Sequence, residues 1–262
     1  MNQSSTRQLY PPFKTVLLIV LAAIFFNAAL KYAGGLGKST AAEKEITDFA
    51  NENGLQLSDY PSEIVDMLKI NEETKDFVLR YPLEIVSFKP DIIDFSEYKE
   101  CTAPPRLIQW DKRWGYMTYD KSIMGLSGSA PTALSMAALY VTHDMTLTPV
   151  HTAELAIGTS AEHKPEKLLA EGARAMGMTV TEIPKNDSRL RQAVSEEGTA
   201  VVCLTDGKVL SQVIVIRGLD ENHNFLINDT LFNKRSEQAY TFKDIGSHIK
   251  RIWQYSASPK AE

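Results

Sequence analysis

The sequence predicts an α+β fold, because helical hydrophobic patterns fill its first part and short apolar strands fill its last part. Before residue 199, most apolar residues recur at spacings of three and four, which is typical of amphipathic helices. After residue 199, apolar runs of strand length alternate with turns rich in Gly, Asn and Asp. Helices that precede a mainly antiparallel sheet indicate an α+β domain.

Residues 127–139 predict the helix around which this domain is organised. Its apolar positions recur at helical spacing, at Leu134, Ala138 and Leu139. Pro131 fits a first helical position, where its missing N–H costs nothing. We therefore expect Ser129 where a small-residue loop turns into the N-terminus of a buried helix. Unpaired N–H groups and the positive end of the helix dipole suit such a position to a nucleophile, but a serine also needs an adjacent base.

Length and composition limit the classes of function. A chain of 262 residues suggests one domain of catalytic size with extra segments. The net charge is −5, and the sequence does not show the excess of basic residues that nucleic-acid-binding proteins carry, which argues against nucleic acid as a partner. Cys101 and Cys203 are too far apart in the sequence to indicate a metal site or a disulfide framework, so free thiols are predicted. The histidines show no paired ligand spacing, and no metal or other cofactor is predicted.

An apolar run at residues 16–30 follows the basic residues Arg7 and Lys14. It predicts a transmembrane helix or signal anchor at 15–33, after a cytoplasmic tail at 1–14. A cleaved signal peptide, which would leave a secreted protein, is the alternative. No small-x-small cleavage site stands clear of the run, which favours the anchor. We therefore expect a single-pass protein of the cell membrane whose C-terminal domain is extracytoplasmic.

The glycine-rich residues 34–40 resemble a phosphate-binding loop only superficially. The first glycine of that motif would have to stand at Tyr32, and the segment follows an apolar run of membrane-helix type rather than a strand. A flexible linker is the better interpretation.

Residues 34–103 are predicted to form this linker and a small helical extension. Helical patterns occur around Ile46, after Pro61, and in a third segment that Pro82 is expected to end. Charged residues on the other faces indicate solvated surfaces. A role of the extension in binding a partner remains an alternative. Residues 91–98 are predicted to be a linker.

The main domain is predicted at residues 104–258. Trp110 and Trp114 indicate aromatic packing around a loop, with ligand stacking as the alternative. Gln109 is an amide donor upstream of the central helix and is suited to stabilise an oxyanion. Helices are predicted at 153–157, 165–176 and about 189–197; strands are predicted at 180–183, 201–204, 209–217, 225–229 and 252–255, with a hairpin turn at Asp206-Gly207.

Five short segments of this domain follow one another in an order that carries a resemblance. They are Gln109-Trp110-Asp111 with Trp114-Gly115-Tyr116, Gly125 to Thr132, Gly158-Thr159-Ser160, Val213 to Asp220, and Ile227-Asn228-Asp229. Together they resemble the C39-like peptidase family over about residues 104–257. The resemblance implies a papain-like fold, in which a cysteine nucleophile begins the central helix and a histidine and an aspartate come from the sheet.

Two positions of the implied catalytic triad depart from the family pattern. The family's Gly-Cys-Gly-Pro-Thr reads Gly-Ser-Ala-Pro-Thr here, which puts Ser129 at the nucleophile position. Its Gly-His-Phe reads Ser-Gln-Val, which puts Gln212 at the histidine position. Asp229 matches the aspartate, and Gln109 resembles the amide that supports the oxyanion.

These departures predict the loss of catalysis. A hydroxyl ionises far less readily than a thiol, and an amide accepts no proton at neutral pH. The loss of a general base alone typically costs on the order of 10²–10⁴ in rate. The sequence therefore favours a pseudo-peptidase that binds a peptide or protein segment in its former active-site cleft.

Two alternatives remain open at this stage. One is a peptidase, another hydrolase or an acyl-transfer enzyme that uses Ser129 with a surrogate base. His223 lies in a polar loop, and His143 lies about four helical turns from Ser129, too far to serve. His151, His163 and His248 lie in loops or near helices and would have to be brought to Ser129 by the fold. The other alternative is a structural domain whose cleft is filled.

Overall fold

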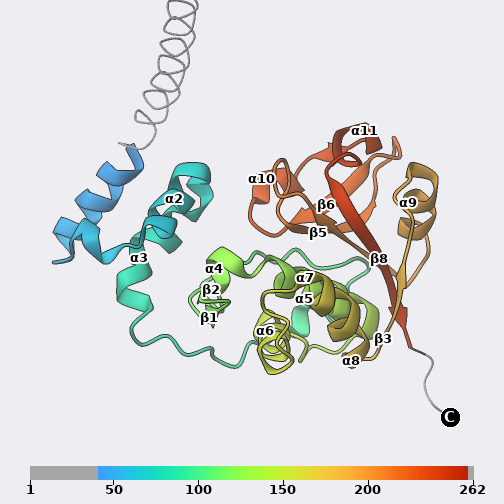
Figure 1. The fold of residues 1–262 in the computed structure, drawn as a ribbon, viewed down its shortest axis with the longest axis horizontal. Helices are drawn as coiled ribbons and strands as arrows, with labels where there is room; N and C mark the ends of the chain where they lie inside the picture. The colour runs from blue at the N-terminus through green and yellow to red at the C-terminus, as the bar shows by residue number, and fades with distance from the viewer. Residues whose placement is uncertain (1–40, 259–262) are drawn as a thin grey trace, which may run out of the picture. The chain divides into compact units, whose positions relative to one another are not determined.

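The computed structural model describes residues 41–258 (Figure 1). The chain divides into two compact units, Met1–Leu57 and Ser58–Glu262. In the first unit, residues 41–52 are helical, as the pattern around Ile46 predicts. The predicted tail, membrane anchor and glycine-rich linker at residues 1–40 lie outside the described residues. Between residues 41 and 258, no helix is long and apolar enough to cross a membrane.

The rest of the predicted helical extension starts at the boundary between the units and continues in the second unit. Its elements are η1 (Leu57–Asp59), α2 (Ser62–Ile70), η2 (Glu72–Thr74), α3 (Lys75–Glu84) and η3 (Ser96–Tyr98). The prediction that Pro82 ends the third helix is wrong, because α3 continues to Glu84. Proline in the last turn removes only one backbone hydrogen bond, and the N–H of Ile85 still donates to the Tyr81 carbonyl at 3.0 Å.

Phe77 anchors the extension to the rest of the unit. Its ring is 1% exposed and stacks on Tyr116 with centroids 4.2 Å apart. The Tyr116 hydroxyl donates to the Phe77 carbonyl at 2.9 Å. Gly115 and Gly125 make room for the ring, since a Cβ at either position would lie 2.6 Å from a Phe77 ring atom. The aromatic ring and the two glycines therefore fit one another.

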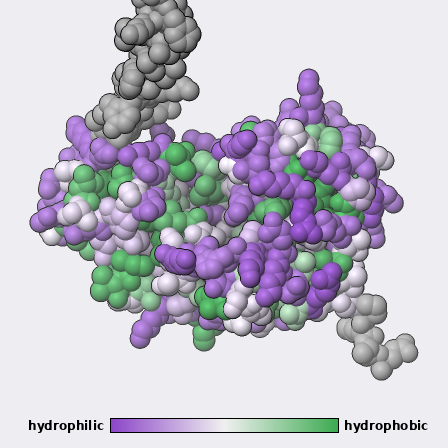
Figure 2. All heavy atoms as spheres, viewed as in Figure 1, coloured by the Kyte–Doolittle hydropathy of each residue, from purple (hydrophilic) through white to green (hydrophobic). Residues whose placement is uncertain are grey.

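The extension also presents apolar side chains to solvent. Leu83, Val86 and Ile92 are exposed at the end of α3 and in the segment that follows it. Figure 2 shows apolar surface, in green, in this region of the molecule. Of these three residues, only Ile92 lies in the segment 91–98 that is predicted to be a linker.

A six-stranded antiparallel sheet forms the second half of the unit, with strand order β3-β8-β4-β5-β6-β7. Its strands are β3 (Met178–Glu182), β4 (Ala200–Thr205), β5 (Val213–Leu219), β6 (Phe225–Asp229), β7 (Ala239–Tyr240) and β8 (Ile249–Ala257). A separate hairpin joins β1 (Thr118–Tyr119) to β2 (Ser122–Ile123). The prediction of an α+β fold with a mainly antiparallel sheet is confirmed.

Helices cover both faces of this sheet (Figure 1). The helices after the extension are α4 (Met124–Ser127), α5 (Ser129–Thr142), α6 (Pro149–Gly158), α7 (Pro165–Lys167), the π-helical turn η4 (Leu168–Gly172), α8 (Ala173–Ala175), α9 (Asp187–Val194), α10 (Asn233–Ser236) and α11 (Phe242–Ile245). Val202 and Leu204 of β4 belong to the core that contains α5, whereas Val201 and Cys203 pack with α9 and α11. The alternation along β4 therefore places one set of side chains on each face.

The predicted boundaries hold closely for some elements and shift for others. β6 matches the predicted strand at 225–229, whereas β5 begins at Val213 instead of residue 209. Residues 206–211 form a loop instead, because pairing across the hairpin ends where the N–H of Thr205 donates to the Gln212 carbonyl at 2.8 Å. The predicted turn at Asp206-Gly207 therefore opens a longer connection.

The central helix α5 is buried along nearly its whole length. It begins at Ser129, so Pro131 is its third residue and not its first as predicted. Proline remains favourable there, because N–H groups of the first turn have no partner within the helix.

Both cysteines lie within the described residues and are free thiols, as predicted. Burial raises the pKa of the Cys203 thiol, on β4, far above its usual value. Burial also raises the pKa of the half-buried Cys101. Neither thiol is therefore activated as a nucleophile.

Replacing Phe77 tests how strongly the extension is anchored. We expect Phe77→Ala to lower the free energy of unfolding by about 3–5 kcal/mol, because it leaves a cavity between two glycines and Tyr116. Leu83→Ala, in the same helix at a side chain that is 42% exposed, should change it by less than about 1 kcal/mol. Urea denaturation measures both variants. Equal losses of unfolding free energy in the two variants would show that the buried Phe77 ring contributes no more to stability than the exposed Leu83 side chain.

Candidate functional site and its cavity

Ser129 lies at an abrupt change of direction between two helices. α4 ends at Ser127, Gly128 follows, and α5 begins at Ser129. A Cβ at Gly128 would collide with the carbonyl oxygen of Met124 and lie 2.9 Å from its sulfur. Only glycine therefore fits between the helices, and this turn presents Ser129 at the N-terminus of α5 as predicted.

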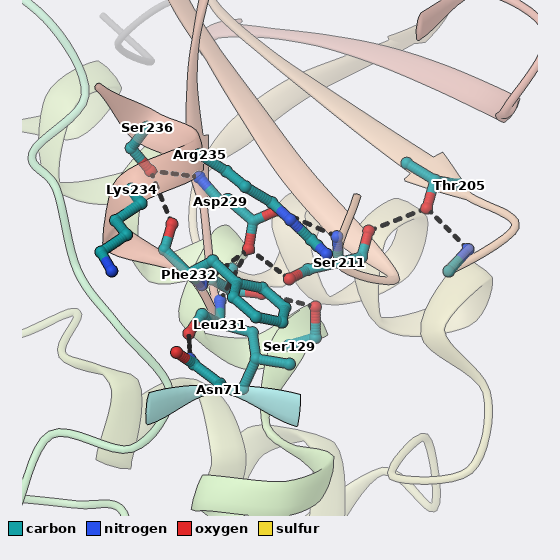
Figure 3. Close-up of polar contacts among 12 residues, drawn as sticks. Asn71, Ser129, Thr205, Ser211, Asp229, Leu231, Phe232, Lys234, Arg235 and Ser236 are labelled. Carbon is teal, nitrogen blue, oxygen red and sulfur yellow. Dashed lines mark hydrogen bonds and ion pairs between the residues drawn. The ribbon is translucent and has the colours of Figure 1, made fainter. Parts of the chain in front are cut away.

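The Ser129 hydroxyl is fully engaged by its neighbours. It accepts a hydrogen bond from the Val213 N–H at 2.9 Å and shares one with the Thr230 hydroxyl at 2.8 Å. The Val213 carbonyl lies 3.3 Å away, and Ser129 is only 6% exposed. The hydroxyl thus ties the start of α5 to the start of β5 and to the residue that follows β6 (Figure 3).

Asp229, the last residue of β6, is buried at the centre of a second set of contacts (Figure 3). Its carboxylate accepts hydrogen bonds from the Ser211 N–H at 3.0 Å, the Leu231 N–H at 2.9 Å and the Phe232 N–H at 3.0 Å. The Ser211 hydroxyl donates a further short bond. Arg235 Nη1 lies 3.5 Å from Oδ2. The carboxylate therefore shapes both the loop before β5 and the turn after β6.

Gln212 lies between Ser211, which contacts Asp229, and Val213, which contacts Ser129. Its side chain is exposed, and its backbone carbonyl accepts the Thr205 N–H. Within residues 41–258, no hydrogen bond joins the Gln212 amide to Ser129 or Asp229. Gln212, which the sequence resemblance suggested as a site residue, is thus not part of the hydrogen-bond network of Ser129 and Asp229 through its side chain. Its neighbour Ser211 holds the carboxylate instead.

Gln109 is buried close to the Ser129 network. Its backbone N–H donates to the Thr230 carbonyl at 2.8 Å, and its Nε2 donates to the Gly125 carbonyl at 2.8 Å. One amide N–H is therefore already used within the protein. Nearby, Trp110 Nε1 donates to the Leu231 carbonyl at 2.8 Å, and Trp114 is buried with its Nε1 on the Ile108 carbonyl. Trp114 packs against Phe95 as the predicted aromatic packing requires, whereas Trp110 is half-buried and is held by its hydrogen bond to Leu231.

A cavity of about 420 Å³ opens beside these residues. It is lined by Ile70, Gln109, Leu126, Ser127, Ser129, Gly207, Lys208, Leu210, Ser211, Gln212, Leu231, Phe232 and Arg235. Three of the four predicted site residues, Gln109, Ser129 and Gln212, therefore gather around one cavity, with Asp229 buried behind its wall. Ile70, at the end of α2, brings the helical extension to the same rim.

The loop at 206–211 forms one wall of the cavity and is held by Asp206. Its carboxylate accepts the Lys208 N–H at 3.0 Å and contacts Nδ1 of His248 at 3.1 Å. These contacts, the Lys208 N–H first, lower the pKa of Asp206 below its usual value. The loop is therefore stabilised by an ionised carboxylate at neutral pH.

All five histidines lie in the described part of the chain, and none hydrogen-bonds to Ser129 or lines the cavity there. His248 contacts Asp206, His163 contacts Asp120, and His143 ends α5 in a left-handed conformation. Residues 41–258 likewise contain no group of three or more His, Cys, Asp or Glu placed to hold a metal ion.

Three residues of this arrangement are missed by sequence reasoning. Thr230 shares the Ser129 hydrogen bond, the Ser211 hydroxyl binds Asp229, and Arg235 lines the cavity. The Ser129–Thr230 contact joins residues 101 positions apart, a separation that no local pattern encodes. Ser211 carries one available signal, since it replaces a glycine of the family pattern next to Gln212.

Comparisons with models of known protein families, with curated proteins and with solved structures found no match to this chain. The interpretation of the site accordingly rests on the geometry of these residues and on the sequence motifs.

Replacing Ser129 tests whether its hydroxyl is a structural tie. We expect Ser129→Ala to lower the free energy of unfolding by about 1–3 kcal/mol, because the buried Val213 N–H loses its acceptor. Ser127→Ala, at a half-buried serine that lines the same cavity, should change it by less than about 0.5 kcal/mol. Chemical denaturation gives both values. An unchanged free energy of unfolding in Ser129→Ala would argue against a structural role of the hydroxyl.

Proposed function

We propose that this protein is a membrane-anchored pseudo-peptidase of the C39-like type, which binds an extended peptide or protein segment outside the cytoplasm. The observation that carries the proposal is the combination of an open cavity beside Ser129 with a Ser129 hydroxyl that has no base next to it. A site of this kind retains a binding surface and lacks an agent for proton transfer.

The contacts of Ser129 argue against nucleophilic catalysis. A serine attacks a carbonyl carbon only when a base removes its proton. The neighbours of Oγ are the Thr230 hydroxyl, the Val213 N–H and the Val213 carbonyl, and none of these is a base at neutral pH. The N–H also occupies a lone pair of Oγ, which makes the oxygen less nucleophilic.

Asp229 supports the same interpretation. In the papain-like arrangement that the sequence resembles, an aspartate orients the catalytic histidine. Here Oδ1 accepts three hydrogen bonds, from the Ser211 hydroxyl and the N–H groups of Leu231 and Phe232, while Oδ2 accepts the Ser211 N–H and lies 3.5 Å from Arg235, so the carboxylate holds the protein's own loops instead of a histidine.

The lining of the cavity suits a peptide. Leu126, Leu210 and Phe232 offer apolar contacts, while Gln109 and Gln212 are amide residues at the same cavity. Peptide affinity comes from side-chain pockets and from hydrogen bonds to the peptide backbone, neither of which needs a nucleophile. Binding can therefore outlast the loss of chemistry.

The proposed location follows from the N-terminal sequence. An anchor at 15–33 with a short basic tail before it would leave the cavity on the outer side of the membrane. Its partners would be peptides or unfolded protein segments present there.

Incubation with a peptide library tests the proposal. We expect the 262-residue chain to retain a subset of peptides and to release no cleavage products, as measured by mass spectrometry of the bound and free fractions. Ser129→Cys combined with Gln212→His provides the matched control, because it restores the family's residue types at both positions.

Two outcomes would contradict the proposal. Cleavage by the wild-type chain that is lost in Ser129→Ala would indicate a serine enzyme with a surrogate base. A chain that neither retains nor cleaves any peptide would indicate a structural domain.

A further inference from the structure

The cavity beside Ser129 has a one-sided distribution of charge. Of the described residues that line it, two are cationic, Lys208 and Arg235, and none is acidic. The chain as a whole carries a net charge of −5, so the charge of the residues that line the cavity is opposite in sign to that of the whole chain. A cavity lined by one sign of charge attracts ligands of the opposite sign.

Arg235 is held rigidly at the cavity wall. Its guanidinium carbon lies 3.6 Å from the centroid of the Phe232 ring, and its side chain is 28% exposed. Stacking of this kind restricts the side chain and leaves the N–H donors at the edge of the guanidinium plane. The arginine is therefore ordered before a ligand binds.

The helix that carries Arg235 is also fixed in place. The Glu73 carboxylate accepts the Asn233 N–H at 2.7 Å and the Lys234 N–H at 3.1 Å. The Ser236 hydroxyl accepts the Asp229 N–H at 2.8 Å. Contacts at both ends of α10 thus position the arginine, which lowers the entropic cost of binding.

Each cation forms an ion pair with one carboxylate, Arg235 with Asp229 and Lys208 with Asp206, but neither side chain donates a hydrogen bond to it. Asp229 lies 3.5 Å from Arg235 but is fully buried and already accepts four hydrogen bonds. Asp206 lies 4.0 Å from Lys208 Nζ and is bonded to the Lys208 N–H and to His248. In the described part of the chain, the Arg235 guanidinium has no hydrogen-bond acceptor. Its donors are available to a ligand.

We propose that the cavity selects peptide segments that carry a carboxylate, and that Arg235 is the residue that binds it, with Lys208 of the 206–211 loop adding attraction. This inference rests on the proposed function and names its ligand class. A planar guanidinium binds a carboxylate through two parallel N–H donors, a geometry that a neutral amide cannot match. The carboxylate comes either from an acidic side chain or from a peptide C-terminus.

Three labelled peptides of equal length and apolar content test this selection. All are acetylated at the N-terminus: one has a central Glu and an amidated C-terminus, one has Gln and a free C-terminus, and one has Gln and an amidated C-terminus. We expect at least one carboxylate peptide to bind the 262-residue chain about 10-fold more tightly than the neutral peptide in fluorescence anisotropy. Which of the two binds identifies the source of the carboxylate.

Variants assign the preference to the cavity. Arg235→Gln should reduce the preference to less than about 2-fold, and Lys208→Gln should weaken it in part. Lys234→Gln is the matched control, because it removes the same charge from α10 at a residue that does not line the cavity. Lys208 is 77% exposed, so Lys208→Gln remains informative even if Arg235→Gln fails to fold.

The outcomes separate this inference from the proposed function. Equal affinity for all three peptides, or a preference that Arg235→Gln and Lys208→Gln leave unchanged, would overturn carboxylate selection and leave peptide binding intact. Failure of all three peptides, together with failure of the library to yield any bound peptide, would overturn both.

Discussion

The Asp229 carboxylate accepts hydrogen bonds from both segments that border the cavity, and the shape of the site depends on it. Burying a carboxylate costs free energy unless hydrogen bonds compensate for the lost water. The four hydrogen bonds to Asp229 are therefore needed for folding as well as for the shape of the site. Those donors fix the loop that carries Ser211 and the turn that carries Phe232. Through that turn, the same carboxylate positions Arg235.

Ser129 plays a comparable part on the other side of the cavity. Its hydroxyl joins the start of α5 to β5 and to Thr230, so Ser129 links helix and sheet. Ser129 satisfies the backbone N–H of Val213, Ser211 donates a hydrogen bond to Asp229, and the Gln212 side chain is exposed.

The helical extension contributes to the site rather than merely preceding it. Asn71 Nδ2 donates to the Leu231 carbonyl at 2.7 Å, and Glu73 binds the first N–H groups of α10. Phe77 secures the extension through Tyr116 and two glycines. Ile70 then completes the rim of the cavity. A ligand bound beside Ser129 would therefore contact residues whose positions depend on segments far apart in the chain.

The sequence by itself determined the α+β class, the buried central helix with Ser129 at its start, and most of the strands, because these follow from local periodicity and from turn residues such as Gly177 and Gly207. It also singled out Gln109, Ser129 and Gln212 through their order along the chain. Only the tertiary structure decided that these residues share a cavity, that Thr230 and Ser211 satisfy Ser129 and Asp229, and that Arg235 faces the same space. The physical reason is that hydrogen bonds and charges act over a few ångströms, between residues that the fold brings together from up to 161 positions apart.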